Sequence, residues 1–307
     1  MFFYKPKFWE HKNSIISYLL YPISLIIIFI NKIKKFKTAK KFNIPIICVG
    51  NIYLGGTGKT PISSEIFDIV KESNKKPAFV KKFYPYLKDE ISLLEMKGEV
   101  FSNKKRIDSI INLQNKNYNV AILDDGYQDF SFIKNYSIVC FNQEKWIGNG
   151  RVIPSGPLRE SFSNINRANC IAINGVKREE IENEILKYNG KIDIVYFEYE
   201  LDIPDNLKFK NVIAFAGIAN PRNFFNLLKK KNINLKDTFN FPDHYNYNDN
   251  DIRNLKQRSY NTNSVLLTTE KDYLRIKEED RKDINFLKLK VVFENKNKFK
   301  SLIKKVI

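Results

Sequence analysis

The residues best able to do chemistry lie in a short glycine-rich segment, Gly-Gly-Thr-Gly-Lys-Thr-Pro, at positions 55–61. A β-branched run at 44–50 precedes it and predicts a buried strand, while the run at 62–73 is compatible with a helix. Strand, glycine loop and helix in this order indicate a phosphate-binding loop, because backbone N–H groups and the positive end of the helix can face phosphate oxygens. We therefore predict a nucleotide site made of seven residues: Gly55, Gly56, Thr57, Gly58, Lys59, Thr60 and Pro61.

Two side chains of this loop have separate tasks. Lys59 is expected to hold the β- and γ-phosphates, which makes it a catalytic residue, and the Thr60 hydroxyl is expected to bind Mg²⁺. The general motif has a glycine where this chain has Tyr53, so we expect Gly55 and Gly56 to supply the flexibility instead.

A second group of candidates follows another predicted strand, at 119–124, which ends in Asp124 and Asp125. Acidic residues at the carboxyl end of a strand beside a phosphate loop complete the Mg²⁺ shell, directly or through water. The alternative is an ordinary Asp-Gly turn. A loop punctuated by glycine and proline at 148–160 ends in Arg159 and Glu160, which could contact phosphate and metal. The predicted metal ligands are therefore Thr60, Asp124, Asp125 and Glu160.

The composition limits the class of protein. The chain has 307 residues, 43% of them hydrophobic, which excludes global disorder. Its three cysteines each lie in an apolar, strand-like run, so we expect them to be reduced and buried in a cytoplasmic protein. Lys and Arg number 52 against 34 Asp and Glu, a net charge of +18. This charge indicates either attraction to polyanions, such as nucleic acid or an anionic membrane, or only drift, that is, a bias of the composition toward Lys without a functional cause.

The N-terminal segment is unusually apolar. Residues 14–30 carry no charge, and lysines flank them on both sides. A spanning helix, a signal peptide and a buried core helix are all possible interpretations. We expect a helix that inserts shallowly, with aromatic side chains at the interface: Phe2, Phe3, Tyr4, Phe8 and Trp9. The segment is thus predicted to be a membrane anchor whose mode of insertion stays open.

The elements that must position these residues alternate as in an α/β protein with a parallel sheet. Predicted strands at 44–50, 77–82, 119–124, 136–141 and 170–174 alternate with helical stretches, and a linking strand is expected within 191–202. A second unit begins with a strand at 211–217 followed by a glycine turn and helix. We predict three parts, with the active site between the last two: the membrane-associated region 1–35, a P-loop domain at 36–200 and a smaller α/β domain at 201–307.

Taken together and in this order, the motifs resemble those of the tetraacyldisaccharide 4′-kinases, the lipid A 4′-kinase family. The resemblance rests on the glycine loop at 55–61, Asp-Asp-Gly-Tyr-Gln at 124–128 and Pro-Ser-Gly-Pro-Leu-Arg-Glu at 154–160. It continues with Phe-Pro-Asp-His-Tyr at 241–245 and Thr-Thr-Glu-Lys-Asp at 268–272, so it covers essentially the whole chain.

The resemblance implies a phosphotransferase with an alcohol acceptor. It would use ATP and Mg²⁺ to transfer the γ-phosphoryl group to the 4′-hydroxyl of tetraacyldisaccharide 1-phosphate, which gives lipid IVA. That anionic lipid suits a basic protein with an apolar helix. We therefore expect a monomer at the cytoplasmic face of the bacterial inner membrane, with this lipid A precursor and the membrane surface as partners and no nucleic acid.

The resemblance also implies roles for individual residues. The family's Ser-Arg-Gly-Tyr corresponds here to Lys-Lys-Phe-Tyr at 81–84, where only Tyr84 matches and Lys82 would replace the arginine electrostatically. A shortened segment leads to Asp89, the candidate catalytic carboxylate. His244 would lie across the cleft from the phosphate loop and pair with that carboxylate to take the hydroxyl proton, unless it only forms a surface turn. Substrate contacts are expected from Tyr84, Gln128 and Arg159.

Other classes of P-loop protein remain alternatives. A GTPase-like metal-delivery factor is disfavoured because the chain has no His/Cys cluster and no Asn-Lys-x-Asp motif for guanine. A nucleic-acid-dependent ATPase rests only on the net charge, and it would bind polynucleotides with a steep salt dependence.

Overall fold

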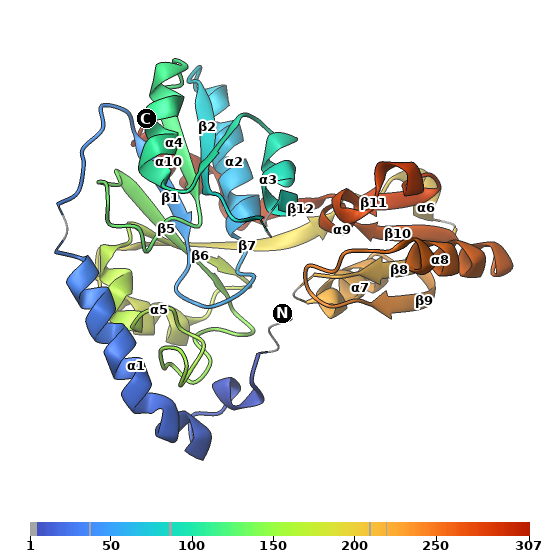
Figure 1. Cartoon of the computed structure of the whole chain (residues 1–307), viewed down its shortest axis with the longest axis horizontal. Helices are drawn as coiled ribbons and strands as arrows, with labels where there is room; N and C mark the ends of the chain where they lie inside the picture. The colour runs from blue at the N-terminus through green and yellow to red at the C-terminus, as the bar shows by residue number, and fades with distance from the viewer. Residues whose placement is uncertain (1–4, 37, 86–87, 209, 219) are drawn as a thin grey trace. The chain divides into compact units, whose positions relative to one another are not determined.

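The structure is a computed structural model that describes residues 5–36, 38–85, 88–208, 210–218 and 220–307 (Figure 1). The chain divides into two compact units, each discontinuous in sequence. Within the described residues, the larger unit comprises 5–36, 38–85, 97–198 and 291–307, and the smaller one comprises 88–96, 199–208, 210–218 and 220–290. The expected interfacial residues Phe2, Phe3 and Tyr4 lie outside the described part of the chain.

The phosphate-loop strand lies inside an eight-stranded sheet with the order β12-β7-β6-β5-β1-β4-β2-β3. All neighbours from β7 to β3 pair in parallel. The central strands are buried, as their apolar β-branched sequences predict. The strands of this sheet are β1 (Ile46–Gly50), β2 (Pro77–Lys82), β3 (Val100–Asn103), β4 (Val120–Asp124), β5 (Tyr136–Asn142), β6 (Cys170–Asn174), β7 (Asp193–Leu201) and β12 (Leu289–Phe293).

Helices of the larger unit pack on this sheet. Helix α2 contacts β1, β2 and β4, α4 contacts β2 and β3, and α10 packs on α2. Burial of Ile62, Ile66 and Val70 on one face of α2 explains why this stretch forms a helix that covers the sheet. The helices of this unit are α1 (Ile15–Lys34), α2 (Lys59–Glu72), α4 (Arg106–Asn115), α5 (Glu179–Leu186), α10 (Lys296–Lys304) and the 3₁₀ helices η1 (Lys7–Glu10) and η3 (Phe162–Arg167).

The smaller unit is built on a second sheet of four parallel strands in the order β11-β10-β8-β9. Its strands are β8 (Asn211–Ala216), β9 (Asn234–Asn240), β10 (Val265–Thr269) and β11 (Ile284–Leu287). Its helices are α3 (Lys88–Glu95), α6 (Asp205–Lys208), α7 (Pro221–Lys230), α8 (Asp249–Asn261), α9 (Glu270–Arg275) and the 3₁₀ helix η4 (Glu278–Asp280). The two sheets confirm the predicted α/β class with a second, smaller α/β unit.

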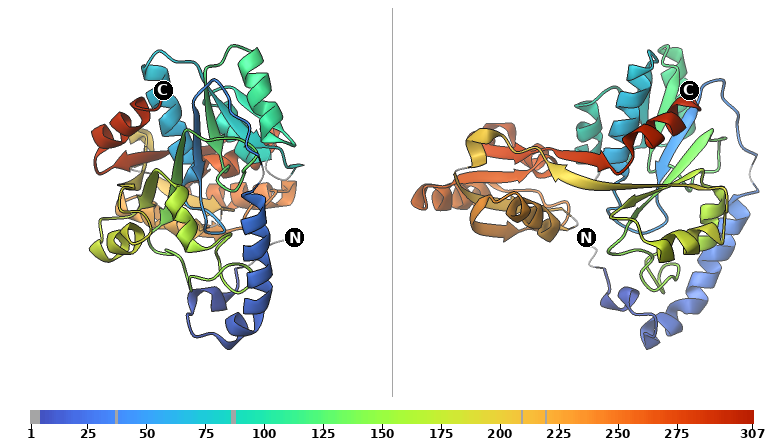
Figure 2. Two further views of the ribbon diagram at one scale, coloured as in Figure 1. Left: turned by 90° about the vertical axis from the view of Figure 1, so that its left-hand side faces the viewer. Right: turned by 180° about the vertical axis from the view of Figure 1, so that it is seen from behind.

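Helix α1 combines buried polar residues with exposed apolar ones. Ser17 and Ser24 are fully buried, and their hydroxyls donate to the carbonyls of Ser155 (2.6 Å) and Val152 (2.8 Å). Asn31, one further heptad along, donates to the carbonyl of Arg159 at 3.1 Å. Figure 2 shows α1, in blue, extending along the loop region after β5. The polar stripe therefore attaches α1 to the loop that carries Arg159.

The remaining surface of α1 is apolar and faces outward. Leu19 is 74% exposed, Ile26 60% and Phe29 63%. By length and composition α1 is suited to a membrane, and only 11% of its most apolar window is buried in the protein. This excludes the core-helix interpretation, because a core helix would bury that surface. Trp9, expected at the interface, is instead buried and donates from Nε1 to the carbonyl of Pro154 at 2.9 Å.

The three cysteines, Cys48, Cys140 and Cys170, are buried free thiols. Desolvation raises the pKa of each thiol, so none of them is a ready nucleophile. The predicted reduced and buried state is confirmed.

Candidate active site

The phosphate loop has the predicted geometry of strand, loop and helix. Strand β1 ends at Gly50, and α2 begins at Lys59 directly after Gly58. Gly55 and Gly58 adopt φ values of 127° and 92°, which only glycine tolerates easily. The Asn51 side chain donates to the carbonyl of Gly55 (3.1 Å) and to the Thr57 hydroxyl (3.0 Å), so it braces the loop from inside. The backbone N–H groups at the start of α2 are those that a phosphate group can use.

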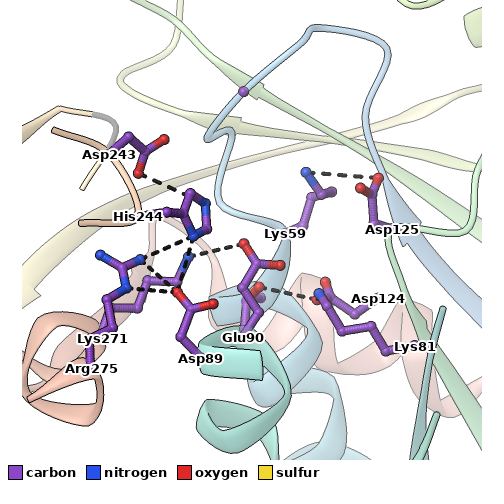
Figure 3. A network of polar contacts seen from close by, with 12 residues as sticks. Lys59, Lys81, Asp89, Glu90, Asp124, Asp125, Asp243, His244, Lys271 and Arg275 are labelled. Carbon is purple, nitrogen blue, oxygen red and sulfur yellow. Dashed lines mark hydrogen bonds and ion pairs between the residues drawn. The ribbon is translucent and has the colours of Figure 1, made fainter. Parts of the chain in front are cut away.

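Asp124 is fully buried at the end of β4, beside this loop. It accepts hydrogen bonds from the Thr60 hydroxyl (3.2 Å) and from the Ser63 hydroxyl (3.3 Å). It also forms a buried ion pair with Lys81 at the end of β2, as Figure 3 shows. The structure therefore brings two of the predicted metal ligands, Thr60 and Asp124, into direct contact.

Asp125 follows with a left-handed backbone, φ 64°, and its side chain meets two cations. Lys59 Nζ lies 3.8 Å from its Oδ1, and Arg159 donates to the same oxygen at 2.9 Å. Burial raises the pKa of Asp125, but the positive charges of Lys59, Arg159 and Lys81 outweigh burial and hold this pKa below its ordinary value. Asp125 is thus an anion that holds Lys59 beside the loop.

Glu160, the last predicted metal ligand, is buried and has partners of its own. It accepts from Gln128 at 2.9 Å and from Arg167 at 2.6 Å. Gln128 also donates to the carbonyl of Asn51 at 2.8 Å, so it links Glu160 to the first residue after β1. Tyr84, predicted to contact substrate, is partly buried after β2, and the Lys82 ammonium lies 5.0 Å from its ring centroid.

The donor set suits Mg²⁺ better than a metal that needs a protein cage. In the described part of the chain, no group of three or more His, Cys, Asp or Glu side chains is placed to hold an ion alone. Mg²⁺ usually takes one or two carboxylates and completes its shell with water and substrate phosphates. Thr60 and Asp124, with Asp125 next in sequence, offer hard oxygen atoms of this kind beside a phosphate loop.

A second cluster of candidate side chains lies within the smaller unit. Asp89, in the first turn of α3, has only 8% of its side chain exposed. Its Oδ2 lies 3.3 Å from Nδ1 of His244 and accepts from Nε (3.0 Å) and Nη2 (2.6 Å) of Arg275. Figure 3 shows these three side chains pointing toward one another. The predicted pairing of Asp89 with His244 is therefore present as a contact.

His244 is fixed by an unusual backbone. It adopts φ 58°, in a turn where its N–H donates to the carbonyl of Gly217 at 3.0 Å. Nη2 of Arg275 also lies 3.3 Å from its Nδ1. Protonated at Nδ1, the ring donates to Asp89; unprotonated there, it accepts from Arg275. The imidazole thus has a hydrogen-bond partner in either state.

Charge determines the state of Asp89. Burial raises its pKa, but the hydrogen bond with His244 and the charges of Arg275 and Lys271 outweigh burial, so the pKa lies well below the usual range for aspartate. Lys271 pairs with the neighbouring Glu90 at 3.0 Å. Asp89 is therefore a carboxylate at neutral pH.

Sequence reasoning did not identify Arg275 or Asp272 as parts of this cluster. Asp272 is fully buried and accepts from the N–H of Gly217 (3.0 Å), from the hydroxyls of Tyr247 (3.1 Å) and Thr269 (2.6 Å), and from Arg275 (3.0 Å). The signal for Asp272 was the Thr-Thr-Glu-Lys-Asp motif, and Arg275 follows one helical turn later. Asp272 thus anchors the arginine that holds Asp89.

Comparison with known proteins agrees with this geometry. The family model for tetraacyldisaccharide-1-P 4′-kinase matches residues 16–307. A tetraacyldisaccharide 4′-kinase of Pelagibacter ubique is 39% identical over 305 residues, covering 98% of this chain and 97% of the relative. Another, from Rickettsia akari, is 34% identical over 292 residues, covering 88% of this chain and 87% of the relative.

A solved structure gives the same result for the fold. The crystal structure of the "apo" form of LpxK from Aquifex aeolicus in complex with ATP superposes with a TM-score of 0.75 at 25% identity, covering 95% of this chain and 99% of that one. The family match decides against the other classes of P-loop protein that the sequence left open. The chain therefore belongs to the tetraacyldisaccharide 4′-kinase family, and it is a phosphotransferase of lipid A biosynthesis.

Proposed function

We propose that the chain binds ATP at its phosphate loop and transfers the γ-phosphoryl group to the 4′-hydroxyl of tetraacyldisaccharide 1-phosphate at a membrane surface. The observation that carries the donor half of this proposal is the loop itself. The loop follows a buried strand, and its positive φ values require glycine. It leads directly into a helix whose first residue is Lys59. Lys59, kept nearby by Asp125, would hold the β- and γ-phosphates.

Thr60, Asp124 and Asp125 are the residues that would hold Mg²⁺, which supplies charge neutralisation to the phosphoryl group when bound there. Glu160 has a different role in our proposal. Its hydrogen bonds to Gln128 and Arg167 support the segment around Arg159, whose guanidinium at Asp125 would contact phosphate oxygens. Tyr84 remains our candidate for a contact with the sugar.

The acceptor half of the proposal rests on Asp89 and His244. A sugar hydroxyl must lose its proton as the phosphoryl group arrives, and a positioned base assists this loss. His244 and Arg275 both contact Oδ2 of Asp89, so we assign proton uptake to Oδ1. His244 would orient the carboxylate and stabilise its charge in the resting enzyme.

Helix α1 supports the membrane part of the proposal. Its polar residues hydrogen-bond to the loop at 152–159, so a spanning orientation would carry those backbone carbonyls toward hydrocarbon at a high cost. We therefore propose that α1 lies in the interface with its exposed apolar face among the acyl chains. Because the nucleotide is cytosolic, the proposed location is the cytoplasmic face of the bacterial inner membrane, where the enzyme acts as a monomer.

The test is transfer of label from γ-labelled ATP, in the presence of Mg²⁺, to purified tetraacyldisaccharide 1-phosphate by the full chain. We expect label on the lipid for the wild type. Lys59→Ala should lower kcat by orders of magnitude, because phosphoryl transfer depends on charge stabilisation. The exposed Lys71→Ala, at the other end of α2, is the matched control and should retain wild-type activity. ATP consumption without labelled lipid would contradict the proposal, as would near-normal transfer by Lys59→Ala.

A further inference from the structure

The feature that the mechanism leaves unused is a lysine buried at the predicted metal site. Lys81 is the last residue but one of β2, which pairs in parallel with β4 through Val80 and Leu123. This register brings Lys81 beside Asp124, the last residue of β4. Only 3% of the Lys81 side chain and none of the Asp124 side chain is exposed. Burial of an ammonium group costs free energy unless a carboxylate compensates its charge. The ion pair of Lys81 with Asp124 is therefore an integral part of the site.

The ammonium and the Thr60 hydroxyl share one carboxylate oxygen. Lys81 Nζ and Thr60 Oγ1 both contact Oδ2 of Asp124, and Ser63 contacts Oδ1. Figure 3 shows Lys81 extended directly toward Asp124. Oδ2 of Asp124 is the oxygen best placed to bind a cation together with Thr60. This oxygen therefore already contacts a cation, the Lys81 ammonium group.

Lys59 differs from Lys81 in both distance and exposure. Lys59 lies 3.8 Å from Asp125 with 14% of its side chain exposed, so it can turn toward a phosphate without losing a tight partner. Lys81 is in closer contact with its partner, Asp124, and the pair is shielded from water. Charge interactions are stronger in such a buried environment than in water. A divalent ion that approached Asp124 would meet this fixed positive charge.

We propose that Lys81 is a resident cation of the metal site, which neutralises Asp124 in the metal-free chain and competes with Mg²⁺ for that carboxylate. It follows that the affinity of the site for a divalent cation is limited by Lys81. This inference deepens the proposed function, on which it rests for the role of Asp124 as a metal ligand.

The experiment measures binding of Mn²⁺, as a spectroscopic substitute for Mg²⁺, to the full-length, nucleotide-free protein by electron paramagnetic resonance. We compare the wild type with Lys81→Gln, which removes the charge and can still donate a hydrogen bond. The exposed Lys71→Gln removes the same charge from the end of α2 and is the matched control. We expect Lys81→Gln to bind Mn²⁺ at least about tenfold more tightly than the wild type, because the repulsion between the metal ion and a buried ammonium group is removed, and Lys71→Gln to bind as the wild type does. Equal or weaker binding by folded Lys81→Gln would overturn the proposal.

Loss of the ammonium leaves Asp124 buried without its cation, so the variant can be unstable. For that case, thermal unfolding of Lys81→Gln and Lys81→Met is followed with and without a large excess of Mg²⁺, because an ion that binds only the folded state raises its stability. We expect Mg²⁺ to raise the melting temperature of both variants more than that of the wild type, or to restore their folding. Failure of Mg²⁺ to do so would also overturn the proposal.

Neither measurement requires lipid, so the two proposals can fail separately. If the wild type phosphorylates the disaccharide but Lys81→Gln does not give the expected results, only the role of Lys81 is refuted. Tighter metal binding without lipid phosphorylation would refute only the proposed function.

Discussion

At the scale of single residues, the candidate site consists of charges that hold one another in place. Asp89 is held by His244 and Arg275, and Arg275 is held in turn by Asp272. Breaking a buried pair by removing one partner is more costly than the pair's net contribution to stability, because the remaining charge stays buried. Substitutions in this cluster must therefore be chosen to separate an effect on catalysis from an effect on folding.

The first prediction concerns the pair of Asp89 and His244. If they take up the hydroxyl proton as a unit, Asp89→Asn or His244→Ala should each lower kcat by about 10²–10⁴. The double variant should be little worse than the more impaired single variant, because residues that act together are not additive. The affinity for ATP should barely change, since neither residue belongs to the phosphate loop. The measurement is a double-mutant cycle on kcat with direct ATP binding in parallel. Fully additive losses would show that the two residues act independently.

The second prediction concerns acid stability. The folded-state pKa of Asp89 lies below its unfolded value, so the ionised carboxylate stabilises the fold. This contribution is complete above the unfolded pKa of about 4 and disappears as the pH falls through the folded-state pKa. At pH 7, Asp89→Asn should thus be less stable than the wild type by about 1.5–3 kcal/mol, the usual value for hydrogen bonds to charged groups. The difference, followed by denaturant unfolding, should shrink below about pH 4. A gap that is independent of pH would mean that the charge of Asp89 does not stabilise the fold.

At the scale of elements, the apolar strands were the most predictable part of the fold. The ranges 77–82 and 170–174 agree with β2 and β6 because buried parallel strands are continuous apolar runs. Strand β9 was not predicted because its sequence, Asn-Leu-Lys-Asp-Thr-Phe-Asn, is polar and largely exposed at the edge of its sheet. Strand β3 is only four residues long and carries little pattern.

The residues of the site were likewise predictable only where they follow a strong local sequence pattern. The glycine loop and the Asp-Asp turn follow strands whose pattern is strong, so both were found from the sequence. Asp89 was reached only by aligning a shortened segment with a family pattern. Arg275 and the contact of Lys81 with Asp124 could not be predicted, because they depend on which strand and helix lie next to each other and not on local spacing.

The third prediction concerns the outward face of α1. Leu19 and Ile26 lie one heptad apart on this exposed face, while Ser17 and Ser24 hold the opposite face against the protein. Leu19→Asp and Ile26→Asp should each weaken binding to lipid vesicles by tenfold or more, since burial of a large aliphatic side chain contributes about 1.5–3 kcal/mol. Phosphorylation of detergent-dispersed substrate should change much less. The measurement is vesicle sedimentation together with a kinase assay in detergent.

Tyr260→Asp provides the control for this experiment. Tyr260 is 88% exposed on α8, away from α1 in sequence, so its substitution should leave vesicle binding unchanged. If the α1 variants sedimented with vesicles as well as this control did, the apolar face would not be the site of membrane contact.

At the scale of the whole molecule, the net charge of +18 is the property that bears on membrane binding. The charge is spread along the chain, and two interpretations remain: attraction to an anionic surface, or drift in a Lys-rich composition. The two interpretations differ in whether the position of each lysine matters. Attraction to a membrane acts only through lysines near the bilayer, since fields from distant charges are screened within about 10 Å at 0.1 M salt.

The last prediction therefore compares two pairs of exposed lysines that contribute equally to the net charge. Lys32 and Lys34 lie at the end of α1, and Lys229 and Lys230 lie at the end of α7. Substituting the first pair by Gln should weaken binding to vesicles that contain anionic lipid by roughly tenfold or more, because each lysine near the surface contributes about 1 kcal/mol. The same change in the second pair should have little effect. Raising the salt concentration should bring wild-type binding down to the level seen with zwitterionic vesicles, at which the apolar face of α1 alone remains effective. Equal losses for the two pairs would instead mean that the total charge of the molecule, and not its position beside α1, draws the protein to the membrane.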